Sequence, residues 1–191
     1  MSAVLRTPTR HPLTLNAVEV LLREGILAPD ARVELIDGDL FDVPPIGPRH
    51  TSLVNSINQL LVIAVGGSAI VQCQSCVRLS ERSVPQPDFA LLRPRADRYR
   101  DALAGAEDIL LLIEVADTTV DFDRTTKARL YARHGIGEYW LFDLNRRCVE
   151  QHREPGPRGY GLMLERSSSE VISPLALPAL ELALAALFQG F

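Results

Sequence analysis

The stretch ILLLIEVA, residues 109–116, constrains the fold more than any other part of the sequence. Its apolar run is interrupted only by Glu114 and lacks the alternation of a half-exposed strand, so it predicts a strand buried on both faces of a sheet. A strand of that kind needs packed layers on both sides, which favours an α/β domain. Glu114 in turn needs a partner, because an unpaired buried carboxylate is energetically expensive.

The segments after this strand predict a connection between parallel strands. Residues 121–134 predict a helix that ends at Gly135, and residues 138–143 predict another apolar strand. A strand, a helix and a strand in this order form a right-handed crossover.

The remaining segments complete an α/β domain. They predict a helix capped by Thr14 that runs to about Arg23, a hairpin at Asp37-Gly38, a helix over about residues 49–65, one or two strands in AIVQCQSCVRL, a short strand in DFALLR, and a hairpin around Pro155-Gly156. We therefore predict a central mixed β-sheet flanked by helices, with additional β-hairpins.

Length and composition favour one ordinary domain over residues 1–191, with 1–11 as a flexible tail and 174–191 as a C-terminal segment docked on the core. The net charge of −4 is not the basic signature of a nucleic-acid-binding protein, although a local basic groove would be compatible with it. The sequence lacks an apolar run long enough to cross a membrane or to form a signal peptide. These features predict a cytoplasmic protein.

Cys73 and Cys76 form a C-x-x-C pattern, which raises the possibilities of a zinc site and of a redox site. A structural zinc site needs four ligands, and the third cysteine, Cys148, is distant and alone. The flanking residues indicate a strand rather than the helix start of a redox motif. We interpret the pair as two half-buried thiols, and the small odd number of cysteines suits a reducing cytoplasm.

Two acids lie at the ends of predicted apolar strands, and this position suggests a metal site. Asp88 opens the DFALL strand, and Glu114 lies near the end of the ILLLIEV strand. Two carboxylates at adjacent strand ends repel one another, and a hard divalent ion such as Mg2+ relieves that repulsion. The backbone carbonyl of Val115 could supply a third oxygen ligand.

A lysine near such a pair would complete the groups needed for metal-assisted phosphodiester hydrolysis. Lys127 is the only lysine, beside nineteen arginines. It shares one face of the 121–134 helix with Asp123 and Tyr131. Spacing alone favours a surface ion pair between Asp123 and Lys127. A catalytic role requires that this face turn toward Asp88 and Glu114.

Several other polar residues have two possible interpretations. Glu34 is either a solvent-facing cross-strand partner or a site residue, and His50 is either a capping residue at a helix start or a base. Asp117 is expected to cap the following helix. Four arginines after the DFALL strand would either contact phosphates or belong to a solvated loop: Arg93, Arg95, Arg98 and Arg100.

Five segments in order resemble the Uma family of restriction-endonuclease-like proteins, within the PD-(D/E)XK nuclease superfamily. The segments are RVELIDGDL, the Pro-rich loop with His50, PQPDFALLRP, LLIEVADTT and DRTTKARLYARHGIGEYWLFDL, and they span roughly residues 14–150. The resemblance implies a restriction-endonuclease-like core with a metal-dependent site at the strand ends.

The resemblance also implies roles for individual residues. Pro87-Asp88 matches the PD motif and Glu114 the second acid, while Ala116 stands where the superfamily has its lysine. The lysine of this family is implied to lie in the following helix, at Lys127. Glu34 and His50 are implied as further site members, and Asp123 as a support for Lys127 or an outer acid.

These observations lead to two main hypotheses. The first is an endonuclease that uses Mg2+ or Mn2+, acts on nucleic acid, with DNA as the expected substrate, and forms a homodimer. The second is a catalytically inactive nuclease-like module for nucleic-acid binding or protein assembly. A weaker third is a small-molecule metal hydrolase. The first requires the Lys127 amine within about 5 Å of both Asp88 and Glu114.

Overall fold

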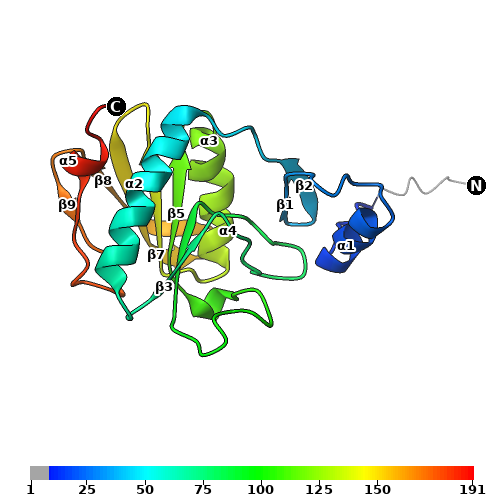
Figure 1. Cartoon of the computed structure of the whole chain (residues 1–191). Helices are drawn as coiled ribbons and strands as arrows, with labels where there is room; N and C mark the ends of the chain where they lie inside the picture. The colour runs from blue at the N-terminus through cyan, green and yellow to red at the C-terminus, as the bar shows by residue number, and fades with distance from the viewer. Residues whose placement is uncertain (1–8) are drawn as a thin grey trace, which may run out of the picture.

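The computed structural model describes residues 9–191, which form a six-stranded sheet with helices on both faces (Figure 1). The strand order is β3-β4-β5-β6-β7-β8. The bounds are Ile70–Cys73, Phe89–Leu92, Ile109–Ala116, Glu138–Asp143, Cys148–Gly156 and Gly159–Ser167. Only β5 and β6 pair in parallel, so the sheet is mixed, as predicted.

Strand β5 is buried on both faces, which confirms the prediction from its apolar run. Leu111 and Ile113 pack on the side of α2 (Pro48–Val65), while Leu112 and Ala116 pack on the side of α4 (Ala128–Arg133). Figure 1 shows α2 lying across the sheet, with α4 in a different layer. Because side chains alternate along a strand, Glu114 belongs to the α4 side.

The connection between β5 and β6 is helical, as predicted, but its middle is wider than an α-helix. It consists of α3 (Val120–Phe122), the π-helical segment η2 (Asp123–Lys127) and α4. Single π-helical turns inside helices occur frequently at functional sites. Both ends of η2, Asp123 and Lys127, have buried side chains.

The N-terminal part contributes a helix and a separate hairpin beside the main sheet (Figure 1). Helix α1 (Leu15–Arg23) begins after Thr14, whose side chain accepts a hydrogen bond from the Ala17 backbone N–H. Strands β1 (Val33–Ile36) and β2 (Asp39–Asp42) pair through the predicted Asp37-Gly38 turn. Both turn residues have positive φ, 52° and 84°, as a two-residue hairpin requires. Residues 1–8 of the predicted tail lie outside the described residues.

Substitution of Gly38 by alanine is expected to destabilise the protein by more than about 1 kcal/mol. Alanine is strained at the φ of +84°, and its Cβ would overlap the Cβ of Pro12. The control is Gly25→Ala, which has a similar φ of +68° but meets nothing within 4 Å. Denaturant unfolding should give a lower midpoint for Gly38→Ala than for Gly25→Ala. Equal midpoints would show that the Pro12 contact is unimportant.

The C-terminal part extends the sheet and closes one side of the core. The β7–β8 hairpin pairs Gly156 with Gly159, so its turn lies at 157–158, two residues after the predicted position. The last residues form β9 (Val171–Ile172), β10 (Leu182–Ala183) and α5 (Leu184–Leu187). Leu184, Leu187 and Phe188 pack into the core on the α2 side.

Cys73 and Cys76 are free and half-buried, and burial raises the pKa of both thiols. Only Ile70–Cys73 of the AIVQCQSCVRL segment is an extended strand, and Cys76 lies in the irregular chain after it. The short 3-10 helix η1 (Ala106–Asp108) precedes β5. Within residues 9–191, no helix has the length and apolar character needed to cross a membrane.

Candidate active site

Glu114 receives two hydrogen bonds from the helical connection that packs on its side of the sheet. The Lys127 Nζ lies 3.0 Å from Glu114 Oε1, and the Tyr131 hydroxyl donates to the same oxygen at 2.6 Å. All three side chains are buried. Ala116, two residues after Glu114, is also buried on this side. Its side chain is small, so a lysine from the facing helix has room to reach Glu114.

The Lys127 ammonium contacts two further carboxylates in addition to that of Glu114. Its Nζ lies 3.0 Å from Glu34 Oε1 and 3.7 Å from Asp123 Oδ1. Only 6% of Lys127 is exposed, so the interpretation as a surface ion pair with Asp123 is wrong. Glu34 is also buried, and it accepts the Gln86 backbone N–H at 2.7 Å. The solvent-facing interpretation of Glu34 is therefore wrong as well.

Asp88 lies directly before β4 and is joined to the end of β5 by a backbone hydrogen bond. The N–H of Val115 donates to Asp88 Oδ2 at 2.9 Å, and His50 Nε2 lies 3.0 Å from the same oxygen. Gln74 donates its side-chain amide to Asp88 Oδ1 at 3.1 Å. Within residues 9–191 Asp88 makes no ion pair with Lys127. The structure therefore places Asp88 and Glu114 beside one another and Lys127 on Glu114.

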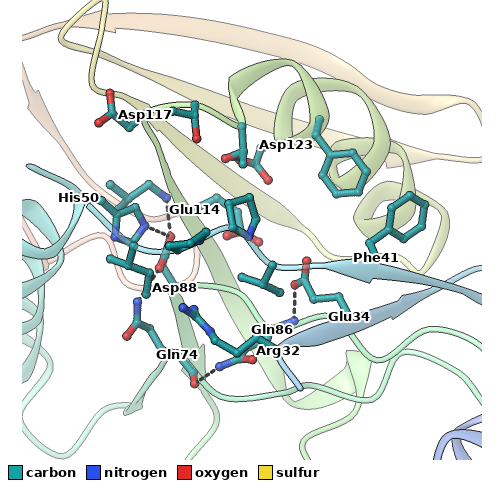
Figure 2. A pocket seen from close by; sticks show the side chains of 18 of the residues that line it. Arg32, Glu34, Phe41, His50, Gln74, Gln86, Asp88, Glu114, Asp117 and Asp123 are labelled. Atoms are coloured by element: carbon teal, nitrogen blue, oxygen red, sulfur yellow. Dashed lines mark hydrogen bonds and ion pairs between the residues drawn. The ribbon is translucent and has the colours of Figure 1, made fainter. Parts of the chain in front are cut away.

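These residues line one cavity of about 330 Å3. Figure 2 shows the acidic side chains Glu34, Asp88, Glu114 and Asp123 reaching it from separate segments of the chain. The segments are β1, the residue directly before β4, the end of β5 and η2. The cavity also contains His50, at the N-terminal turn of α2. All five predicted catalytic residues thus line the same space.

The electrostatics of this cluster are those of several acids around one cation. Burial raises the pKa of Glu114 well above its ordinary value and also raises the pKa of Asp123, and neighbouring acids add to both effects. Burial alone would lower the pKa of Lys127, but the charges of Glu114, Glu34 and Asp123 outweigh it and raise that pKa. Lys127 therefore stays protonated and offsets part of the negative charge.

His50 interacts with Asp88 through one ring nitrogen only. Burial alone lowers the pKa of His50, but the hydrogen bond and charge of Asp88 outweigh it and raise that pKa above its ordinary value. The other ring nitrogen, Nδ1, is buried without a hydrogen-bond partner among the described residues. His50 therefore orients Asp88 rather than capping α2, whose preceding residue is Gly47.

The expectation for Asp117 is wrong, and of the two interpretations of the four arginines the structure favours the loop. Asp117 does not cap the next helix: its side chain pairs with Arg49 at 3.0 Å, and Thr119 is the residue before α3. The four arginines after β4 do not line the cavity, because they follow the strand end opposite to Asp88. Two of them pair within their own loop, Arg95 with Asp97 and Arg100 with Asp101.

The sequence model of the Uma2 family, described as "Putative restriction endonuclease", matches residues 18–185. The chain belongs to the Uma2 family. Among curated proteins, none matches the chain.

A solved structure shares the fold of this Uma2-family chain. It is a "putative nuclease belonging to DUF820" from Anabaena variabilis ATCC 29413, with a TM-score of 0.73 and 16% sequence identity. The match covers 93% of this chain and 98% of that one. At this identity the likeness concerns the fold, and it confirms the restriction-endonuclease-like architecture. Family membership and fold together support a nuclease-like function.

Sequence reasoning missed Arg124, which fixes η2 to the sheet of this Uma2-family chain. Its guanidinium lies 3.1 Å from Asp143 and 2.7 Å from Glu150, two buried acids on β6 and β7. Because Arg124 lies between Asp123 and Lys127 in the same helical turn, these ion pairs set the position of both site residues. The signal available in the sequence was the pair of acids in apolar strands, Asp143 and Glu150.

Substitution of Arg124 by glutamine is expected to destabilise the protein by about 2 kcal/mol. This is less than the roughly 3–5 kcal/mol of a fully buried pair, because 31% of the Arg124 side chain is exposed. The control is Arg129→Gln on the same connection, since Arg129 is exposed and makes no ion pair among the described residues. Equal stability of the two variants would contradict a fixing role for Arg124.

The effect of Arg124→Gln should also depend on pH. Burial alone raises the pKa of Glu150, but hydrogen bonds from His152 and Arg124 outweigh it and lower that pKa to about 2. A lowered carboxyl pKa gives stability that is complete above its ordinary value of 4.5 and is lost as the pH falls through about 2. Urea unfolding at about pH 7 and about pH 3 should show a smaller difference between variant and wild type at the lower pH.

Proposed function

We propose that this chain is an endonuclease that requires Mg2+ or Mn2+ and hydrolyses phosphodiester bonds of nucleic acid, with DNA as the expected substrate. The observation that carries the proposal is the position of the Lys127 ammonium. It lies 3.0 Å from Glu114 and 3.0 Å from Glu34, in the cavity that Asp88 also lines. Two strand-end acids and a charged lysine are the groups that metal-assisted hydrolysis uses.

The chemistry of the oxygen donors suits Mg2+. Asp88 and Glu114 would hold the ion together with the backbone carbonyl of Val115. This carbonyl points from β5 in the same direction as the Val115 N–H, which donates to Asp88. Glu114 Oε2 has no hydrogen-bond partner among the described residues. Within residues 9–191, no group of three or more His, Cys, Asp or Glu side chains is arranged to hold a metal ion. Mg2+ commonly takes only one or two carboxylates, with water and substrate oxygens as its other ligands.

The side chains of the site would have different roles, which follow from their charges and positions. When bound, the ion would polarise the phosphate and lower the pKa of a water molecule. Lys127, held in its charged form, is suited to stabilise negative charge and to donate a hydrogen bond, and it is unsuited to accept a proton. Glu34 and Asp123 would hold the ammonium in place. His50 would keep Asp88 oriented toward the end of β5.

The proposal predicts cleavage of plasmid DNA by the purified protein. Supercoiled plasmid and circular single-stranded DNA would be incubated with Mg2+ or Mn2+, with and without a chelator, and separated on agarose. We expect nicked or linear products with the metal and intact DNA with the chelator. Cleavage that continues with the chelator would exclude a metal-dependent mechanism.

An inactive nuclease-like module is the alternative, and one observation favours it. Lys127 already pairs with three carboxylates, so the acids of the cavity are partly neutralised without a metal. Binding of DNA without cleavage under any metal would support this alternative. The homodimer stays a prediction, which sedimentation equilibrium would test.

A further inference from the structure

The cavity has an apolar part of its lining that phosphodiester chemistry does not use. Its residues are Phe41, Val43, Pro44, Pro45, Ile46 and Phe122. The rings of Phe41 and Phe122 are in contact, with centroids 5.1 Å apart, and both side chains are only half-buried. Ile46 is 38% exposed. Figure 2 shows Phe41 in the same space as the acidic side chains.

This apolar lining is built from segments that are distant in the sequence. Phe41 lies on β2, and Phe122 ends α3, directly before the site residue Asp123. Aromatic and proline side chains left beside water in a cavity indicate a ligand with an apolar flat surface. A phosphate group has no such surface, whereas every nucleobase has one and stacks readily on aromatic rings.

The size and charge of the cavity exclude a duplex as the group that enters it. A volume of about 330 Å3 accommodates a ligand the size of one nucleotide unit, far less than a paired double helix. Six acids line the cavity: Glu34, Asp42, Asp88, Glu114, Asp117 and Asp123. The lysine and arginine side chains in its lining are Lys127 and Arg32. Binding to duplex DNA ordinarily depends on several Lys or Arg contacts to phosphates.

We propose that the cavity takes one unstacked nucleobase, stacked on Phe122 beside the tilted ring of Phe41, and that the preferred substrate is single-stranded nucleic acid. The proposal rests on the proposed nuclease function, because it places the sugar-phosphate next to that base at Asp88, Glu114 and Lys127. A base must leave its stack to enter such a cavity, and this costs least in a single strand.

Binding of oligonucleotides tests the proposal without cleavage. The probes are a fluorescently labelled single strand of mixed sequence and the matched duplex, measured by anisotropy with Ca2+ in place of Mg2+. We expect the single strand to bind at least about tenfold more tightly than the duplex. Equal or tighter binding of the duplex would overturn the proposal, as would the absence of binding to either probe.

Variants of Phe122 separate stacking from simple packing. Phe122→Leu keeps an apolar side chain and should weaken single-strand binding about tenfold, whereas Phe122→Trp should keep or strengthen it. Unchanged affinity in the leucine variant, with thermal unfolding like wild type, would overturn the role of the ring.

Cleavage assays distinguish failure of this proposal from failure of the nuclease proposal. Cleavage of duplex and single strand at equal rates would support the nuclease proposal and contradict the proposal that the cavity binds one base. Selective binding of the single strand, with no cleavage in Mg2+ or Mn2+, would support the proposal that the cavity binds one base and would contradict the nuclease proposal.

Discussion

Substitution of Lys127 by methionine is expected to abolish cleavage and to destabilise the protein by about 3–5 kcal/mol. The ammonium pairs with Glu34, Glu114 and Asp123, and it is almost fully buried. Without it, these acids lose the cation that offsets their charge and must take up protons or draw in water. The transition state also loses the positive charge beside the phosphate, which should reduce the rate at least about 100-fold.

The control for this prediction is Lys127→Arg, which keeps the positive charge. Arginine should retain more of the stability than methionine, but its larger planar group does not fit the position of the ammonium, so cleavage should still fall strongly. Thermal unfolding and cleavage would be measured for all three proteins. Wild-type stability in Lys127→Met would contradict the buried cluster, and wild-type cleavage would contradict the role of Lys127.

Substitution of Asp88 by asparagine is expected to remove cleavage while the fold is retained. The amide has nearly the same shape and keeps an oxygen that can accept the Val115 N–H, and the Gln74 amide can turn its oxygen toward the new NH2 group, so stability should change by only about 1 kcal/mol. The negative charge that a divalent ion needs is lost. We expect cleavage at least about 100-fold slower and weaker binding of Mn2+ in calorimetric titration.

The control is Asp117→Asn, which removes another carboxylate from the lining of the same cavity. Asp117 pairs with Arg49 at the surface and is not joined to Val115. Cleavage and Mn2+ binding should stay within about threefold of wild type in this variant, since it removes a screened charge and a surface ion pair with Arg49 but no proposed metal ligand. Equal losses in the two variants would indicate that only the total charge of the cavity matters.

Much of the central fold was predictable because it depends on local patterns. The apolar run of 109–116, interrupted only by Glu114, identified the central strand, and the 3.6-residue periodicity of residues 49–65 identified the helix on one face of the sheet. The Asp37-Gly38 turn requires positive φ at both residues, and few other residue pairs allow it. The irregular chain after Cys73 has no such pattern, so the sequence left open whether AIVQCQSCVRL forms one strand or two.

The candidate site was only partly predictable because burial depends on tertiary contacts. Spacing could not show that Lys127 faces Glu114, since the same helix face could have pointed to solvent. Glu34 is buried because the Gln86 backbone and Lys127 of η2 both contact its carboxylate, an arrangement that strand alternation does not reveal. Asp117 pairs with Arg49, 68 positions earlier in the chain, a contact that no local cap rule contains.

The central claim is that Asp88, Glu114 and Lys127 form one metal-dependent hydrolytic site. Its most direct test is the rate of cleavage of a labelled single-stranded oligonucleotide with protein in excess, as Mn2+ is titrated. We predict a rate that rises to saturation with Mn2+ for the wild type and for Asp117→Asn, and no measurable cleavage for Asp88→Asn or Lys127→Met. A saturating, wild-type rate in Asp88→Asn would contradict the account.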